Sequence, residues 1–189
     1  AYSSAHIERR YREFVAAFGG KAMLCFAVKA LSNLAVLRHL FQLGAGADLV
    51  SEGELRRVLA AGIPASRIIF SGIGKTETEL RAALAADVHQ INVESPPELS
   101  LLSDVATRMG KTARIAIRVN PDVDANTHAK ISTGKSENKF GIDLAHAADA
   151  FRRAKQLPGI EPVGVAVHIG SQITSLAPFD TAFARVVNL

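Results

Sequence analysis

Lys29, Arg118 and His168 are three polar residues that could act together, because each follows an apolar stretch of the chain. Lys29 comes after Phe26 and Val28, and a lysine in such surroundings either extends its ammonium into solvent or loses its charge. A neutral lysine amine can condense with a carbonyl compound to form a Schiff base. The alternative, a lysine that merely ends a strand in solvent, is equally consistent with the residue type.

Side-chain alternation along a strand places the three polar residues on matching faces. If residues 23–30, 114–120 and 162–169 are strands, each polar residue shares its face with small neighbours. These neighbours are Cys25 and Ala27 for Lys29, Ala116 for Arg118, and Gly164 and Ala166 for His168. We therefore expect the three polar side chains to converge at the carboxyl ends of the strands. Taken alone, His168 is more typical of a hydrogen-bonded structural histidine, and Cys25 of a small core residue.

Six apolar runs that alternate with helical patterns must position these side chains. They recur roughly every 20 to 25 residues, a spacing typical of successive βα units with parallel strands. The expected strands are residues 23–30, 47–51, 67–71, 90–93, 114–120 and 162–169. Asp48, Ser71 and Ser171 stand at ends of these runs equivalent to those of the first three polar residues.

Helix boundaries are indicated by capping residues between the expected strands. A Ser or Thr followed three residues later by Glu predicts a capping box, and a glycine after a helical run predicts its end. The capping pairs are Ser51 with Glu54, Thr76 with Glu79, and Ser95 with Glu98, and the terminating glycines are Gly44, Gly62 and Gly110. Near the N-terminus, one helical stripe of Ile7, Tyr11, Phe14, Val15 and Phe18 predicts a helix that docks on the body of the protein.

Two architectures accept six βα units, an open doubly wound sheet and a (β/α)8 barrel. A doubly wound nucleotide-binding fold usually has a glycine-rich turn after its first strand, and residues 26–33 contain no glycine. The sequence therefore favours an α/β protein with a (β/α)8 TIM barrel. Because a complete barrel needs about 250 residues and the chain has 189, we expect residues 1–189 to be one incomplete barrel domain with about six βα units.

Two further segments carry polar residues with possible roles. Gly74-Lys75-Thr76 resembles the end of a phosphate-binding P-loop, but Ile69 stands where that motif requires glycine. Residues 120–142 have neither helical nor strand periodicity, and loops longer than about 12–15 residues are usually functional or disordered. This segment contains His128, Thr133, Lys139 and Phe140, and a solvated surface loop is the alternative.

Composition excludes several classes of protein. The net charge is +4, with basic and acidic residues interspersed, so nothing indicates a nucleic-acid-binding surface. The single cysteine cannot form an internal disulfide, and no apolar run approaches the roughly 20 residues of a membrane span. His128 and the acids near it lack the spacing of a metal site. We therefore expect a cytoplasmic protein without membrane, nucleic-acid or metal binding.

Five separated motifs resemble the ornithine/diaminopimelate/arginine decarboxylases, which have an alanine-racemase-like barrel. The first two are FAVKA at 26–30 and SNLAVL at 32–37, which resemble the attachment site of pyridoxal 5′-phosphate (PLP). RVNP at 118–121, TG at 133–134 with KFG at 139–141, and HIGSQ at 168–172 resemble the diaminopimelate branch of the family. Leu31 departs from the pattern, since the family commonly has a polar residue or cysteine there.

The resemblance implies a role for each matching position. Lys29 would hold PLP as a Schiff base and exchange it for the amine of the substrate. His168 would stack on the pyridine ring, and Ser171 would bind the phosphate. Asp48 and Arg118 would lie beside the cofactor and the lysine. The catalytic residues would then be Lys29 and His168, and all five positions would bind the cofactor.

The implied reaction removes the carboxylate at the D-centre of meso-2,6-diaminopimelate and yields L-lysine and carbon dioxide. The family acts as homodimers, with Lys139 near the interface. It also uses a glycine-rich phosphate loop, an acid on the ring nitrogen and a C-terminal β-domain, none of which this chain contains, so we expect little or no activity from the chain alone. Alternatives are a decarboxylase of ornithine or arginine, a single-barrel PLP carrier without catalysis, and a silent homologue, which should have lost the lysine.

Overall fold

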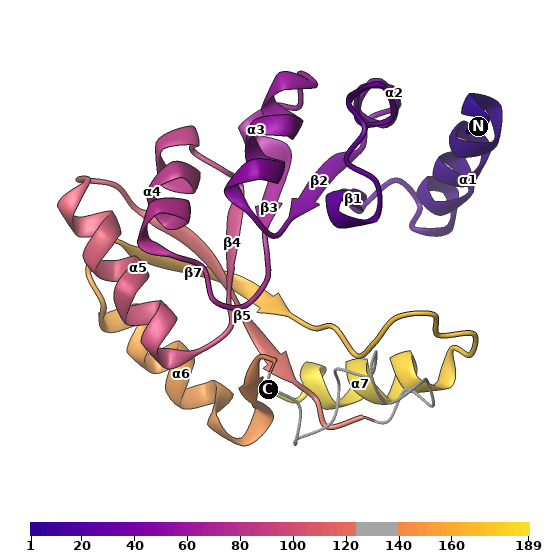
Figure 1. Ribbon diagram of the computed structural model, residues 1–189. Helices are drawn as coiled ribbons and strands as arrows, with labels where there is room; N and C mark the ends of the chain where they lie inside the picture. Colours follow the sequence, from indigo (N-terminus) through magenta and orange to yellow (C-terminus); the bar gives the residue numbers. More distant parts are fainter. Residues whose placement is uncertain (124–139) are drawn as a thin grey trace. The chain divides into compact units, whose positions relative to one another are not determined.

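The computed structural model describes residues 1–123 and 140–189, and the chain divides into two compact units, Ala1–Ile91 and Asn92–Leu189. Helices alternate with strands along both units (Figure 1), and the strand pairs described within each unit are parallel. The βα pattern predicted from the sequence is therefore confirmed. No helix in residues 1–123 or 140–189 combines the length and the apolar character needed to cross a membrane.

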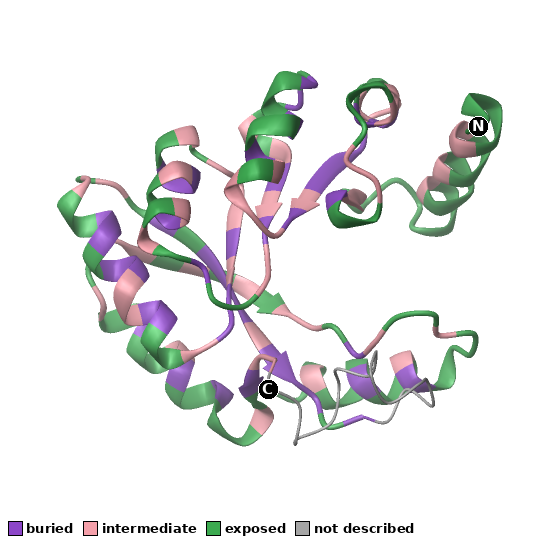
Figure 2. Ribbon diagram, viewed as in Figure 1, coloured by how far each residue is buried: buried purple, intermediate pink, exposed green. Residues whose placement is uncertain are grey.

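The first unit is a parallel sheet with helices packed along it. Its elements are α1 (Ser4–Ala17), β1 (Cys25–Ala27), η1 (Val28–Ala30), α2 (Leu34–Gln42), β2 (Gly46–Leu49), α3 (Glu52–Ala60), η2 (Ala65–Arg67), β3 (Ile68–Phe70), α4 (Glu77–Ala86) and β4 (Gln90–Val93), which reaches past the division between the units. Strand β2 pairs with β1 and β3, and β3 pairs with β4. Leu49, Ile68 and Phe70 are buried on the strands, and Leu55, Val58 and Leu80 are buried on the helices. Figure 2 shows buried positions on both the strands and the helices of this unit.

The second unit is organised around β5. Its elements are α5 (Pro96–Arg108), β5 (Ala113–Asn120), β6 (Ile142–Asp143), α6 (Leu144–Gln156), β7 (Ile160–Ala166) and α7 (Ala177–Val187). Strand β5 pairs with β7 from Ala113 to Arg118 and with β6 at Val119 and Asn120. Helices α5 and α6 contact both β5 and β7. Ile115 and Ile117 are fully buried, as expected for the central strand of this unit.

The predicted strands are confirmed in position, and the bounds of most of them differ by one to three residues. Two of these differences affect the candidate site residues. Strand β1 ends at Ala27, where residues 23–30 were expected, and the chain continues as the 3₁₀ turn η1 that contains Lys29. Strand β7 ends at Ala166, two residues before His168. Alternation along a strand therefore reaches neither Lys29 nor His168, although it holds for Arg118 inside β5. The short β6 was not predicted, because residues 120–142 show no strand periodicity.

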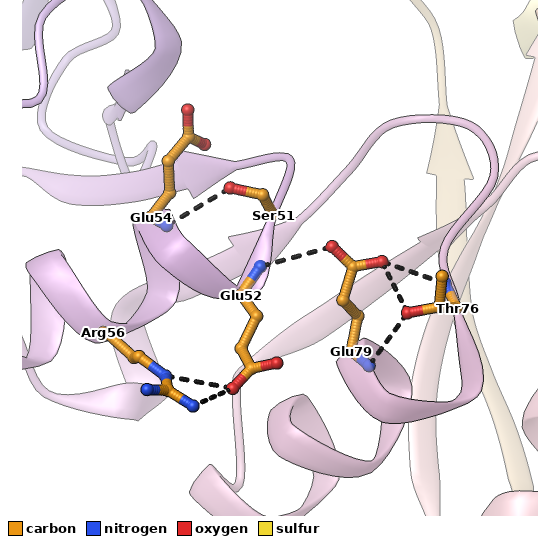
Figure 3. A network of polar contacts seen from close by, with 6 residues as sticks. All are labelled: Ser51, Glu52, Glu54, Arg56, Thr76 and Glu79. Carbon is orange, nitrogen blue, oxygen red and sulfur yellow. Dashed lines mark hydrogen bonds and ion pairs between the residues drawn. The ribbon is translucent and has the colours of Figure 1, made fainter.

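The three predicted capping pairs differ in geometry. Thr76 and Glu79 form the full reciprocal box, in which each side chain accepts a hydrogen bond from the backbone N–H of the other residue. Glu79 also accepts the backbone N–H of Glu52 at 3.4 Å (Figure 3), which links the starts of α3 and α4. Ser51 caps α3, but Glu54 accepts the N–H of Val50, one residue before the cap.

Ser95 caps α5 as Ser51 caps α3, and the glutamate three residues later again binds the residue before the cap. Its hydroxyl accepts the N–H of Glu98 at 3.3 Å, and the Glu98 carboxylate accepts the N–H of Glu94 at 3.3 Å. The predicted ends of α2, α3 and α5 are confirmed, since the last residue of each helix lies two residues before Gly44, Gly62 or Gly110. The caps were therefore predicted correctly, while the partners of two of the three glutamates were not.

Replacing Glu79 with glutamine should lower the free energy of unfolding by about 0.5–1 kcal/mol at neutral pH, the range of a helix-capping interaction. The backbone N–H of Thr76 holds the pKa of Glu79 below its ordinary value of 4.5. Glu79 therefore stabilises the fold fully above that value, and the contribution is lost as the pH falls through the lowered folded pKa. Urea unfolding of the full-length protein and the variant at neutral pH and at about pH 3 checks this. A difference that grows on acidification would contradict it.

Candidate functional site

Lys29 lies on the turn that follows β1. Val28, the first residue of this turn, is fully buried, and the N–H of Leu31 donates to the carbonyl of Val28 at 3.0 Å. Lys29 itself is exposed. A buried neighbour thus anchors the turn, while the amine is accessible to an aldehyde from solvent.

Asp48 and Ser71 stand at the same edge of the first unit's sheet as Lys29. Asp48 on β2 is the register partner of Ala27, two residues before Lys29. The Ser71 hydroxyl, just past β3, donates to Asp48 Oδ1 at 2.5 Å. The structure therefore brings a carboxylate, fixed by a hydroxyl, to the strand neighbouring the lysine turn. Ser71 was noted from the sequence as a strand-end residue, but its bond to Asp48 was not predicted.

Arg118 forms the main ion pair of the second unit's described residues. Its Nη1 donates to both carboxylate oxygens of Glu94, at 2.8 and 3.0 Å. The side chain of Glu94 is 2% exposed and that of Arg118 is 12% exposed. The guanidinium also lies over the ring of Phe140, 5.2 Å from its centroid. Sequence reasoning missed Glu94, although an acid directly after a predicted strand was a signal that could have found it.

His168 and Ser171 follow β7 in the same unit. Ala166, the last residue of β7, is the register partner of Arg118, so His168 lies two residues beyond that level. His168 lines a small cavity of about 120 Å³ with Ile169 of its own segment and with Phe179 and Phe183 of α7, whose rings stack 6.4 Å apart. His168 and Ser171 are both exposed.

The predicted site residues therefore fall into two groups. Lys29 and Asp48 belong to the first unit, and Arg118, His168 and Ser171 belong to the second. Each group stands at the carboxyl ends of its strands, which is where barrel enzymes carry their chemistry. The convergence of Lys29 with Arg118 and His168 stays a prediction. His128, Thr133 and Lys139 lie outside the described residues.

Lys75 forms a hydrogen bond within its own loop. Its side chain is buried, its Nζ donates to the carbonyl of Gly72 at 2.6 Å, and it lies 6.0 Å from the centroid of the Phe70 ring. This agrees with the sequence argument against a P-loop, in which the lysine must reach a phosphate. Within the described ranges, no cluster of three or more His, Cys, Asp or Glu side chains is arranged to hold a metal ion.

Cys25 should react slowly with thiol reagents at neutral pH. Burial, and then the charge of Asp48, raise the pKa of its thiol to about 11. Cys25 lines an apolar groove of about 550 Å³ beside α1, with Phe14 and Tyr11 of the helix stripe. Because only the thiolate is a good nucleophile, its alkylation rate should rise through pH 9 and above, rather than level off near the ordinary value of 9.0. Iodoacetamide labelling with peptide mapping checks this, and a plateau by about pH 9 would contradict the raised pKa.

The helix stripe itself is only partly covered. Helix α1 contacts α2, and the imidazole of His39 lies 3.3 Å from the carbonyl oxygen of Ser4. No residue of α1 is buried, and Phe14 is 60% exposed. The predicted helix is confirmed, and it packs on the first unit with Phe14 and Phe18 of its apolar stripe still exposed.

Comparisons with known proteins identify relatives of this chain. Residues 4–189 match the family model described as "Pyridoxal-dependent decarboxylase, pyridoxal binding domain". The diaminopimelate decarboxylase of Pseudomonas fluorescens is 56% identical over 190 residues, which cover 100% of this chain and 46% of the relative. That of Pseudomonas aeruginosa is 52% identical, with the same coverage.

A solved structure extends the similarity to the fold. The diaminopimelate decarboxylase from Helicobacter pylori complexed with L-lysine matches with a TM-score of 0.96 and 44% identity, over 99% of this chain and 48% of that chain. The chain thus spans about half the length of the relatives it matches. The predicted fold class, an incomplete α/β barrel, is confirmed by this match. The chain belongs to the family of pyridoxal-binding domains of the pyridoxal-dependent decarboxylases.

Proposed function

We propose that this chain is the PLP-binding part of an enzyme that decarboxylates meso-2,6-diaminopimelate to L-lysine. The observation that carries the proposal is the exposed amine of Lys29 at the carboxyl end of β1, in a chain that diaminopimelate decarboxylases match along its whole length. The proposal takes residues 1–189 as one domain and assigns them to the attachment of the cofactor.

The residues present fit this cofactor by their chemistry. An exposed primary amine can capture an aldehyde, and guanidinium, imidazole and hydroxyl groups suit a phosphorylated aromatic anion. Lys29 would hold PLP covalently through Nζ, and Ser171 would donate to its phosphate. His168 would stack on the ring. When bound, PLP supplies the electron sink that accepts the pair left by departing carbon dioxide.

The protein's own part is to fix groups around that sink. Ser71 keeps the Asp48 carboxylate oriented by donating to Oδ1. This pair would set the charge beside the lysine turn, where the amine would exchange the cofactor with the amine of a substrate.

Reduction of the loaded full-length protein with borohydride, followed by peptide mapping, tests the attachment. We expect the label on Lys29, and a label on another lysine would contradict the proposal. Release of carbon dioxide from meso-2,6-diaminopimelate, ornithine and arginine, each offered separately, tests the substrate. Equal or faster release from ornithine or arginine would assign the enzyme to another branch, and binding without release would favour a PLP carrier.

The same proposal covers assembly and location. The resemblance supports a homodimer for the full-length protein, and the composition supports a cytoplasmic location and no nucleic-acid or membrane partner. Sedimentation of the full-length protein should give twice the mass of one chain, and a monomer that retains full activity would contradict the dimer.

A further inference from the structure

Glu94 is a buried carboxylate that sequence reasoning and the proposed chemistry did not use. It directly follows β4, and its side chain is 2% exposed. Burying a carboxylate is costly unless a charged partner compensates it. Here both oxygens accept hydrogen bonds from the single Nη1 of Arg118. One guanidinium nitrogen therefore binds both oxygens of the buried carboxylate.

Arg118 is held from a second side by Phe140 and Gly141. The Phe140 ring lies under the guanidinium, an arrangement that favours a cation over an aromatic face. Gly141 has a φ of +76°, and a Cβ there would come within 3.0 Å of the Arg118 carbonyl oxygen and 3.3 Å of its Cγ. Only glycine lets the chain pass so close to the arginine, and this approach places the preceding ring.

The carboxylate is itself anchored to the start of α5. The backbone N–H of Glu94 donates to Glu98, and Glu98 is tied by its own N–H to the Ser95 cap. A continuous series of bonds thus runs from the first turn of α5 to the guanidinium. Arg118 is the register partner of Ala166, two residues before His168. This series therefore ends at one proposed cofactor-binding residue, next to the segment that carries another.

We propose that Glu94 is the positioning residue for Arg118: its carboxylate and the Phe140 ring hold the guanidinium where it acts on the cofactor, and the negative charge makes the pair neutral overall. An arginine side chain has many rotamers, and restricting it to one of them on binding costs conformational entropy. Holding the side chain in that rotamer beforehand removes this cost from cofactor binding. This inference rests on the proposed function, because Arg118 matters here only through the cofactor.

The test compares Glu94→Gln with Glu98→Gln in the full-length protein. Glu98 is a buried glutamate of the same helix start, and its replacement keeps an acceptor oxygen for the Glu94 N–H. The readouts are the Kd for PLP, followed by absorbance, and the melting temperature of the protein without cofactor. We expect Glu94→Gln to raise the Kd about tenfold, because small misplacements of a positioned group are costly. Glu98→Gln should keep it within about twofold.

If Glu94 acts through Arg118, a second expectation follows for the double variant. In an Arg118→Gln background, Glu94→Gln should change the Kd no further, whereas independent roles would multiply the two effects. Glu94→Gln should also lower the pH midpoint of the Schiff-base absorbance, since it leaves a net positive charge. A structural role alone would move the melting temperature and neither of these readouts.

The outcomes separate this inference from the proposed function. If Arg118→Gln weakens PLP binding and Glu94→Gln does not, or if their effects multiply, the positioning role is wrong while the function stands. If Arg118→Gln leaves the Kd unchanged, Arg118 does not act on the cofactor and the positioning role is wrong. If the Schiff base does not form on Lys29, the proposed function itself fails. Should Glu94→Gln not fold, Glu94→Asp retains the charge but withdraws it by one methylene, and it should raise the Kd in the same direction. An unchanged Kd for Glu94→Asp would then overturn the inference.

Discussion

Replacing Lys29 with alanine in the full-length protein should abolish covalent PLP attachment and lower kcat/KM by at least about a thousandfold. In the proposed function, this amine binds the cofactor and releases it to the substrate in each turnover, and neither neighbour on the turn, Val28 or Ala30, carries an amine. Absorbance of the Schiff base, borohydride trapping and carbon dioxide release measure the effect.

Lys21→Ala is the matched control. Lys21 is also exposed and precedes β1, but it lies outside the turn that carries Lys29. Its replacement should leave trapping and turnover at the level of the unmodified protein. Trapped label or near-normal turnover in Lys29→Ala would remove the central residue of the proposed function.

Replacing Arg118 with glutamine should cost about 3–5 kcal/mol of the free energy of unfolding, because it leaves the Glu94 carboxylate buried without its charged partner. Adding Glu94→Gln to the same chain should recover most of that loss, since two neutral amides can hydrogen-bond without an uncompensated charge. Urea unfolding of the cofactor-free protein measures both variants.

If the residues act as a pair, the losses in free energy of unfolding caused by the two single replacements should not add in the double variant. A double variant as unstable as the sum of both would show that each residue stabilises the fold separately. A loss below about 1 kcal/mol for Arg118→Gln would show that water or another group already compensates the carboxylate. Either result would contradict the buried pair as the main interaction of Arg118.

The ends of the strands show how far local pattern can be followed. Residues 90–93 were predicted with the bounds of β4, because turn and cap residues flank them closely. Residues 23–30 form one apolar run, yet β1 ends at Ala27. Apolar residues suit a strand or a buried turn equally well, and the described pairing with β2 stops where Ala27 meets Asp48. The residue types alone do not indicate where this strand pairing ends.

The hydrogen-bond and ion-pair partners of polar residues show a second limit of prediction from the sequence. Arg118 was placed correctly on its strand, and its small neighbours indicated the face. Its partner Glu94 lies 24 residues away in the sequence. Several acids are available at similar separations, and only the fold selects one of them. The same holds for Ser71, which lies 23 residues from Asp48.

The sequence by itself determined the alternation of strands and helices, the helix caps and the family to which the chain belongs, and it singled out Lys29 as the candidate for cofactor attachment, because these features depend on short stretches of residues. Only the tertiary structure decided where β1 and β7 stop, that Lys29 stands on a turn, and that Glu94 holds Arg118. Those features depend on hydrogen-bond and charge partners that are distant along the chain, and an ion pair forms only when folding removes both groups from water together.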